Sequence, residues 1–351
     1  MACVNPYYIK KFNTYVPCGQ CYLCKSNNST EWTVRIQGER LNPKYHNGIF
    51  LTLTVNDESI GKVFPRVRKN AISCYSLSKR PFQLFMKRFR KAVASLGYDS
   101  SMKYLMCGEY GGMDSVNSLS TEKLHRPHYH VILLGGDIFS PANRDDLKSI
   151  LCDTWTYCDS FMWNEKGCIG SIDTSSIKYV CGYVNKKLSD RTDYSHYGLL
   201  PPFKLSSKNL GKDFFMDCIK KHTYDNHLRV KVRLGGKLID CRIPRTFWTH
   251  IDDDDLLQAL EDIRLESRLD ECPKKLRKIG LKMGLKDKEL DSFISDGFEK
   301  YKALNKGIKY ECKDGSIKYF NSSDVNVMYT TLTKEERKNK EAMRIARKMI
   351  K

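Results

Sequence analysis

The 351-residue sequence lacks several features that would each assign it to a class of proteins. No run of 18 consecutive apolar residues occurs, so no helix is expected to span a membrane. The first residues lack the basic-then-apolar order of a secretory signal peptide, and we therefore expect a cytoplasmic protein. A GxxxxGK[ST] phosphate-binding loop is also missing, which excludes a helicase of that class. Internal repeats and low-complexity linkers are absent, so the sequence marks no sharp domain border.

Acidic residues are in the minority. The chain has 60 Lys and Arg against 41 Asp and Glu, a formal net charge of +19, which favours a polyanionic partner. Charge alone does not separate DNA, RNA and membrane surfaces. Many cations lie on a helix predicted at 78–96, where they surround an apolar stripe. The candidate DNA-binding residues of this helix are Arg80, Lys87, Arg88, Arg90 and Lys91. A solvated helix face and a phosphate-binding face both explain them.

Cysteine, in contrast, is plentiful, with 14 residues. Without an export signal, reduced thiols are expected rather than disulfides. Cys18, Cys21 and Cys24 are spaced as metal ligands, and Cys3 can be the fourth ligand of a structural zinc. Such a site would organise an N-terminal segment that has little core of its own. An iron–sulfur cluster is disfavoured because Asn28 occupies the position of the matching fourth cysteine.

The order of the predicted elements is typical of an α+β fold. The apolar patterns predict strands at 49–55, 103–110, 128–134 and 161–172. They predict helices at 29–42, 78–96, 140–155 and 175–188. Tight loops between the middle strands indicate an antiparallel β-sheet covered by helices.

Composition divides the chain into three parts. Residues 1–28 form a cysteine-rich N-terminal segment, and 29–200 carry the predicted α+β domain. Residues 201–351 are mixed at first, with a hairpin expected at 228–243 around two glycines, and then mostly helical and basic.

The first candidate site lies on the strand at 128–134. Because side chains two residues apart share one face of a strand, the imidazoles of His128 and His130 can reach one ion. Glu109, one strand earlier, can complete a set of three ligands if the two strands are antiparallel neighbours. Imidazole and carboxylate together suit Mn or Mg, and open positions would let the ion polarise a phosphoryl oxygen. A pair of hydrogen-bonded structural histidines is the alternative interpretation.

The second candidate site lies on the helix at 175–188. Tyr179 and Tyr183 are one turn apart on one face, which Lys186 and Lys187 continue. A separate apolar stripe can dock on the sheet. A phenol is a weak nucleophile near neutral pH unless its target is activated, and a metal on a phosphate together with a nearby lysine supplies that activation. Alternatively, the two tyrosines are ordinary aromatics of an amphipathic helix.

Taken together, these motifs resemble the HUH endonucleases, which include Rep proteins, relaxases and related transposases. The resemblance rests on the strand FLTLT at 50–54, on the His128–His130 pair, and on the Tyr-x-x-x-Tyr-x-x-Lys helix. Shorter motifs are similar to those of microvirus replication initiators, especially the gokushovirus branch. These motifs are Cys18-Gly-Gln-Cys21, GEYG at 108–111, RPHYH at 126–130 and YVNKK at 183–187. The similar region runs from about residue 17 to 190.

The resemblance implies a mechanism of rolling-circle replication. His128, His130 and Glu109 would hold Mg or Mn against the scissile phosphate of the origin. One tyrosine would attack, giving a 5′-phosphotyrosine bond and a 3′-OH primer, and the second would act after one circuit so that the displaced strand is closed into a circle. Gly182 stands where this branch commonly has a lysine between the tyrosines, which leaves open which tyrosine acts first.

The same resemblance implies the partners. They would be single-stranded and supercoiled viral origin DNA and a host helicase, in the cytoplasm of a bacterial host. It implies no oligomeric state.

Three other functions stay open at this point. A non-catalytic, zinc-stabilised nucleic-acid-binding protein explains the charge and the cysteines but not the two candidate sites. A metal-dependent hydrolase that uses water would need further ligands soon after His130, and only Asp137 occurs in the next eleven residues. An HUH transposase would share the tyrosine chemistry and differ in its strand-transfer products.

Overall fold

The computed structural model describes most of the chain. The described residues are 3–9, 14–69, 72–111, 126–164, 168–173, 175–177, 179–181, 194, 198–234, 236–305, 310–311, 317–318, 333, 336, 338–339 and 342–343. The chain forms two compact units. One comprises Asn28–Lys221 and Val232–Ile239, and the other comprises Met1–Asn27, His222–Lys231 and Asp240–Lys351. Within the described ranges, no helix has the length and apolar character needed to cross a membrane.

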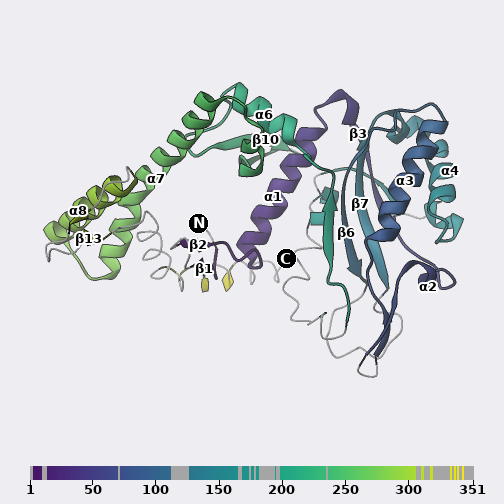
Figure 1. Cartoon of the computed structure of the whole chain (residues 1–351), viewed down its shortest axis with the longest axis horizontal. Helices are drawn as coiled ribbons and strands as arrows, with labels where there is room; N and C mark the ends of the chain where they lie inside the picture. The colour runs from purple at the N-terminus through teal and green to yellow at the C-terminus, as the bar shows by residue number, and fades with distance from the viewer. Residues whose placement is uncertain are drawn as a thin grey trace. The chain divides into compact units, whose positions relative to one another are not determined.

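A five-stranded antiparallel sheet forms the centre of the first unit (Figure 1). Its strands, in spatial order, are β8 (Ile169–Ser171), β3 (Asn47–Leu53), β7 (Pro127–Gly135), β6 (Lys103–Tyr110) and β9 (Phe203–Ser206). Each neighbouring pair is antiparallel. The central strand β7 is covered on both faces, which explains its unbroken apolar run. The predicted α+β class with a helix-covered antiparallel sheet is confirmed.

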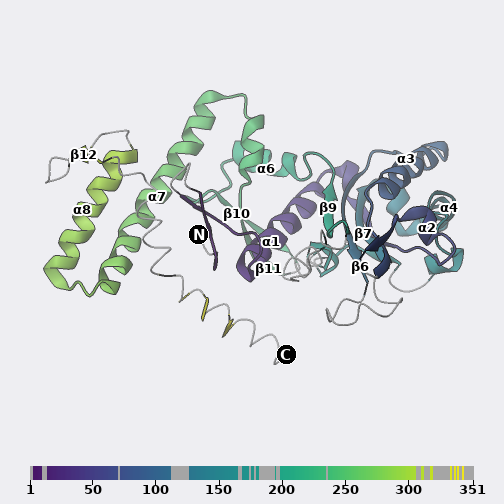
Figure 2. The same ribbon diagram turned by 60° about the horizontal axis from the view of Figure 1, so that its bottom comes forward.

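Two helices, α3 (Arg80–Ser95) and α4 (Arg144–Thr154), cover one face of this sheet (Figures 1 and 2). The core beneath them takes alternate residues of the strands, among them Leu51, Met106 and Tyr129. The apolar stripe predicted for α3 is confirmed, because its members are all buried. They are Phe82, Phe85, Met86, Phe89 and Val93.

The opposite face of the sheet packs against α1 (Tyr22–Glu39) and against the helical residues 175–177 and 179–181. The buried side chains of this second cluster are Ile36, Leu105, Cys107, Ile132, Leu134, Ile172, Ile177, Val180, Cys181 and Leu210. Helix α1 begins seven residues before the predicted start at 29, so it crosses the border expected at residue 28. The rest of the helix predicted to reach 188 lies outside the described residues.

Shorter elements complete the first unit. They are η2 (Pro43–Tyr45), α2 (Ile60–Val63), β4 (Arg66–Lys69), β5 (Ile72–Tyr75), η3 (Asp137–Phe139), η4 (Pro141–Asn143), η5 (Ser160–Asn164) and α6 (Lys212–Lys220). Ser140 caps η4, since its hydroxyl accepts a hydrogen bond from the backbone N–H of Ala142.

The C-terminal part is mostly helical, as predicted. Helices α7 (Asp254–Lys282) and α8 (Asp287–Asn305) pack through Cys272, Leu276 and Ile279 against Phe293 and Phe298. The remaining elements of this part are η6 (Arg245–His250), β12 (Tyr310–Glu311) and β13 (Ile317–Lys318). The hairpin predicted at 228–243 is confirmed as β10 (Arg229–Leu234) and β11 (Lys237–Arg242).

A buried ion pair ties the end of α1 to the sheet. The carboxylate of Glu39 accepts a hydrogen bond of 2.6 Å from Lys103 Nζ on β6, and another of 2.7 Å from the backbone N–H of Gly211. The Glu39 side chain is 1% exposed. Since an unpaired charge in such surroundings is costly, the pair fixes where α1 ends relative to β6.

We predict that Glu39→Ala lowers the free energy of unfolding by about 3–5 kcal/mol, because it leaves the Lys103 ammonium and the Gly211 N–H without their acceptor. Urea unfolding followed by circular dichroism measures the change. Asp99→Ala is the matched control, since it removes the exposed ion pair with Lys44 and should leave stability nearly unchanged. Equal effects of the two substitutions would contradict the structural role of Glu39.

Candidate functional site

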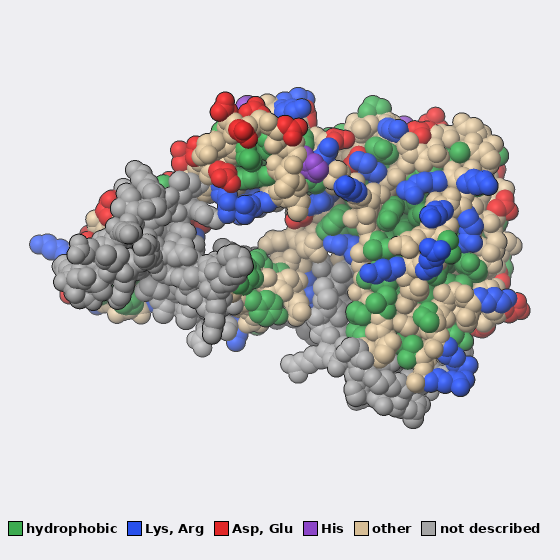
Figure 3. Space-filling view, viewed as in Figure 1, with side chains coloured by type: hydrophobic (Ala, Val, Ile, Leu, Met, Phe, Trp, Pro, Cys, Tyr) green, Lys and Arg blue, Asp and Glu red, His purple; other side chains and the backbone are tan. Residues whose placement is uncertain are grey.

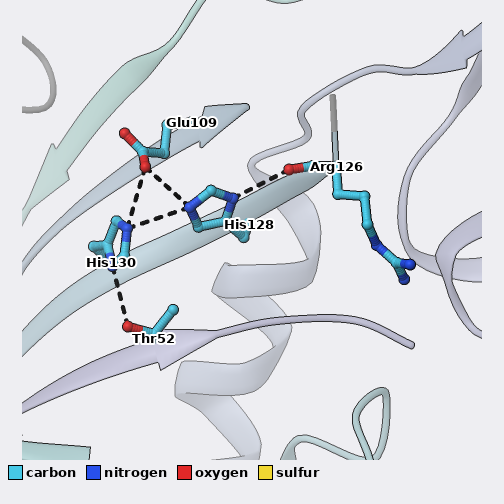
Figure 4. Close-up of polar contacts among 5 residues, drawn as sticks. All are labelled: Thr52, Glu109, Arg126, His128 and His130. Carbon is cyan, nitrogen blue, oxygen red and sulfur yellow. Dashed lines mark hydrogen bonds and ion pairs between the residues drawn. The ribbon is translucent and has the colours of Figure 1, made fainter. Parts of the chain in front are cut away.

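Three ligand-type side chains converge on one face of the sheet (Figure 4). Glu109 lies on β6 directly opposite His128 on β7, and His130 follows two residues later on the same face. One ligand atom from each lies within 4.8 Å of the other two. The antiparallel pairing that the sequence required for this set is present.

The two imidazoles point at the same carboxylate oxygen. Glu109 Oε1 lies 2.9 Å from His128 Nε2 and 3.2 Å from His130 Nε2, and the two nitrogens are 3.2 Å apart. His128 Nδ1 lies 3.1 Å from the backbone carbonyl oxygen of Arg126, to which it donates a hydrogen bond. Neutral His128 therefore turns a lone pair toward Glu109, and two facing acceptors need a proton or a cation between them.

Other side chains hold these imidazoles in place. Thr52 Oγ1 on β3 lies 3.1 Å from His130 Nδ1, and the ring of Phe50 stacks on His130 with centroids 5.7 Å apart. The guanidinium of Arg126 bonds Asp57 and the carbonyl of Val55, which anchors the segment whose carbonyl receives His128. Contacts of this kind orient imidazoles in metal sites.

The carboxylate of Glu109 is charged and almost fully buried, with 4% of the residue exposed. Burial by itself raises the pKa of this carboxyl, but hydrogen bonds from His128 and His130 outweigh burial and lower the pKa to about 2. Its second oxygen, Oε2, is buried and has no hydrogen-bond partner among the described residues. Leaving such an atom unpaired costs free energy, so this donor set of two imidazoles and one carboxylate fits a divalent cation.

Tyr179 lies beside this group. Its ring meets the ring of His130 edge-on at a centroid distance of 5.4 Å and that of Phe50 at 6.0 Å. The residue is 45% exposed, while Ile177 and Val180 are buried against the sheet. The predicted division of this helix into a packing side and a tyrosine side is confirmed for the turn around Tyr179. Tyr183, Lys186 and Lys187 lie outside the described residues.

The sequence-based reasoning missed several neighbours of the site. Phe50 and Thr52 belong to the FLTLT strand, and period-two alternation from the histidine pairing would have identified both. Lys204 gave no such signal, because β9 was not predicted. It pairs with Cys107 and thus shares the sheet face of Glu109, and its Nζ lies 4.0 Å from the ring centroid of Trp32. Burial lowers the pKa of Lys204.

The candidate DNA-binding residues of α3 lie on the other side of the sheet. Arg80, Lys87, Arg88 and Lys91 are exposed, and Arg90 is half-buried with its guanidinium donating to the carbonyl of Met102. Figure 3 shows Lys and Arg side chains gathered over this part of the surface. Since α3 covers the face opposite Glu109 and His130, these cations do not contact the site, and their role in DNA binding stays a prediction.

The four cysteines of the predicted zinc site come together in the second unit. The sulfur atoms of Cys3, Cys18, Cys21 and Cys24 all lie within 4.8 Å of one another.

Comparison with known proteins adds independent information. The family model of the replication-associated protein ORF2 matches residues 48–188, the range that contains β3, β6, β7 and the tyrosine helix. A protein of Spiroplasma virus 4, named replication-associated protein ORF2, is 32% identical to this chain over 252 residues. The similarity covers 70% of the chain and 69% of the relative. No solved structure matches the chain significantly.

Proposed function

The chain belongs to the family of the replication-associated protein ORF2, and we propose that it initiates replication by nicking and rejoining single-stranded DNA through a tyrosine. Membership confirms the resemblance to rolling-circle replication initiators of phages with single-stranded DNA. The observation that carries the proposed chemistry is the convergence of Glu109, His128 and His130 on one point with Tyr179 beside them.

The proposed site divides its work between holding a cation and attacking phosphorus. Glu109, His128 and His130 would hold Mg or Mn, with the orphaned Oε2 of Glu109 available as a further donor. A bound divalent cation would polarise a phosphoryl oxygen of the scissile phosphate. Thr52 and Phe50 keep the imidazoles oriented before DNA arrives.

Tyr179 is the described residue best placed to be the nucleophile, because it is exposed on the side that faces strand β7 at His130. Its phenolic oxygen would form a bond to phosphorus while the bond from phosphorus to the 3′ oxygen breaks. The phenol loses its proton and the 3′ oxygen gains one, leaving a 5′-phosphotyrosine and a 3′-OH primer. Attack of a 3′-OH on that phosphotyrosine reverses the exchange and rejoins the strand without ATP.

The roles of Tyr183, Lys186 and Lys187 rest on the sequence motif alone. Tyr183 would be the second nucleophile, and the lysines would stabilise the negative charge of the transition state. Lys204 is a further candidate for that second role, since it lies on the same sheet face as Glu109. The proposed partners are single-stranded and supercoiled viral origin DNA and a host helicase, in the cytoplasm of the bacterial host.

A non-catalytic DNA-binding protein is the main alternative. It leaves the buried, charged carboxylate of Glu109 with one oxygen lacking a hydrogen-bond partner in the described structure. It also gives no reason for two preoriented imidazoles beside an exposed tyrosine. An HUH transposase would use the same residues and is distinguished by its strand-transfer products.

We predict that the wild-type protein binds one Mn²⁺ at this site, and that Glu109→Gln or His130→Ala abolishes binding because each removes a ligand. Thr52→Val should weaken Mn²⁺ binding by about 10-fold, since it removes only a contact that orients His130. Isothermal titration and Mn²⁺ EPR measure the affinities. His46→Ala, which changes an exposed histidine of the same unit, is the control. Unchanged binding in Glu109→Gln with native circular dichroism would refute the assignment of the ligands.

We also predict a covalent adduct between the protein and a labelled single strand that contains the origin, formed only with Mn²⁺ or Mg²⁺. Because two tyrosines are proposed as nucleophiles, Tyr179→Phe and Tyr183→Phe should each retain some adduct, and the double variant should retain none. Denaturing gels with 5′- and 3′-labelled DNA identify the fragment that is attached.

The exposed Tyr7→Phe provides a matched control and should behave as wild type. Tight DNA binding with no adduct under any of these conditions would refute the tyrosine mechanism and leave a binding protein. An adduct that survives in the double variant would instead assign the nucleophile to another residue.

A further inference from the structure

The N-terminal cysteines form the second ligand cluster of the described residues, separate from the site on the sheet. Cys3 precedes β1 (Tyr7–Ile9), Cys18 follows β2 (Thr14–Val16), and Cys21 and Cys24 lie at the beginning of α1. All four are present as thiols, and all four sulfurs lie within 4.8 Å of one another.

The local fold explains why these distant thiols meet. Strands β1 and β2 pair antiparallel, with Tyr7 opposite Val16, so the chain ends that carry Cys3 and Cys18 come together. Gly19 then turns the chain with a φ of +73°, a conformation that a glycine adopts without strain. Because side chains three residues apart share one face of a helical turn, Cys21 and Cys24 point the same way at the start of α1.

The distances fit one tetrahedral ion. A zinc–sulfur bond of about 2.3 Å places the sulfurs of a tetrahedral site about 3.8 Å apart. The sulfurs of Cys3 and Cys21 are 3.9 Å apart, which is far longer than the roughly 2.05 Å of a disulfide bond.

Backbone N–H groups point at the sulfurs. The N–H of Cys18 donates to Cys3 Sγ at 3.2 Å, and the N–H of Cys21 donates to Cys18 Sγ at 3.3 Å. The N–H of Val4 lies 3.5 Å from Cys21 Sγ. Donors around the sulfurs stabilise the thiolates that a metal needs and orient them, as outer contacts do in metal sites.

We propose that Cys3, Cys18, Cys21 and Cys24 bind one structural Zn²⁺ that holds the N-terminal segment together. Binding replaces the thiol protons, so four thiolates bond to the ion and four protons are released. The closed set of four sulfurs leaves no open position for a substrate, which distinguishes it from the site on the sheet.

The segment needs such a cross-link because its own core is small. Strands of three residues do not form a stable hairpin alone, and among the described residues before α1 only Cys3 and Val4 are buried. The zinc would also fix the first turn of α1, the helix that contributes Trp32 and Ile36 to the packing of the sheet's second face. This role is independent of the proposed nuclease chemistry.

The test is metal analysis of the full-length protein purified without added metal. We expect one zinc per chain in the wild type, and no zinc in Cys18→Ser or in Cys24→Ser. The double variant His128→Ala/His130→Ala and the control Cys74→Ser should each retain one zinc, because neither changes the cluster. Zinc lost only from the histidine variant would place the ion on the sheet and overturn the proposal.

A second measurement covers cysteine variants that fail to fold. Titration of the thiols of the wild-type protein with an organomercurial should release zinc and unfold the N-terminal segment, and reduction followed by added zinc should restore it. Replacement by Co²⁺ should give the visible absorption of a tetrahedral thiolate site. Iron in place of zinc, an octahedral cobalt spectrum, or no metal in folded wild-type protein would each overturn the proposal.

Discussion

The antiparallel register between β6 and β7 determines which side chains can act together in this protein. Glu109 lies opposite His128, and the period of two along β7 returns His130 to the same face. A slip of one residue would turn both imidazoles into the core beneath α3 and expose Tyr129. Two contacts oppose that slip: Tyr129 is buried, and its hydroxyl donates a hydrogen bond of 2.6 Å to the carbonyl of Ser78. The packing of one face therefore maintains the chemistry of the other.

The site exchanges stability for readiness to bind. A buried carboxylate whose second oxygen has no hydrogen-bond partner in the described structure is a poor structural element. Its charge persists because two imidazoles face it, and those imidazoles are themselves held by Thr52 and by the carbonyl of Arg126. A cation would satisfy all three groups at once, and this makes the arrangement intelligible as a ligand set rather than as a hydrogen-bonded core.

Much of this arrangement could be predicted from the sequence because it depends on local patterns. The stripe of α3 and the apolar run of β7 gave the central elements, and the spacing of His128 and His130 gave their shared face. The order of the strands could not be predicted in the same way. Strand β9 is four residues long and joins β6 from about a hundred positions along the chain, so Lys204 remained hidden. Likewise, α1 begins inside the cysteine cluster, where thiol spacing indicated a metal but no helical pattern was evident.

The two ligand clusters follow opposite chemical requirements, which argues that they do different work. Four thiolates are soft ligands that enclose a zinc ion completely, so the ion can serve only the fold. Two imidazoles and a carboxylate leave positions open, and an exposed tyrosine stands at their edge. If one metal served both purposes, chelation would abolish folding and activity together. Since the ligand sets differ, a chelator that removes Mg or Mn but is too weak to strip zinc should stop nicking while the N-terminal segment stays folded.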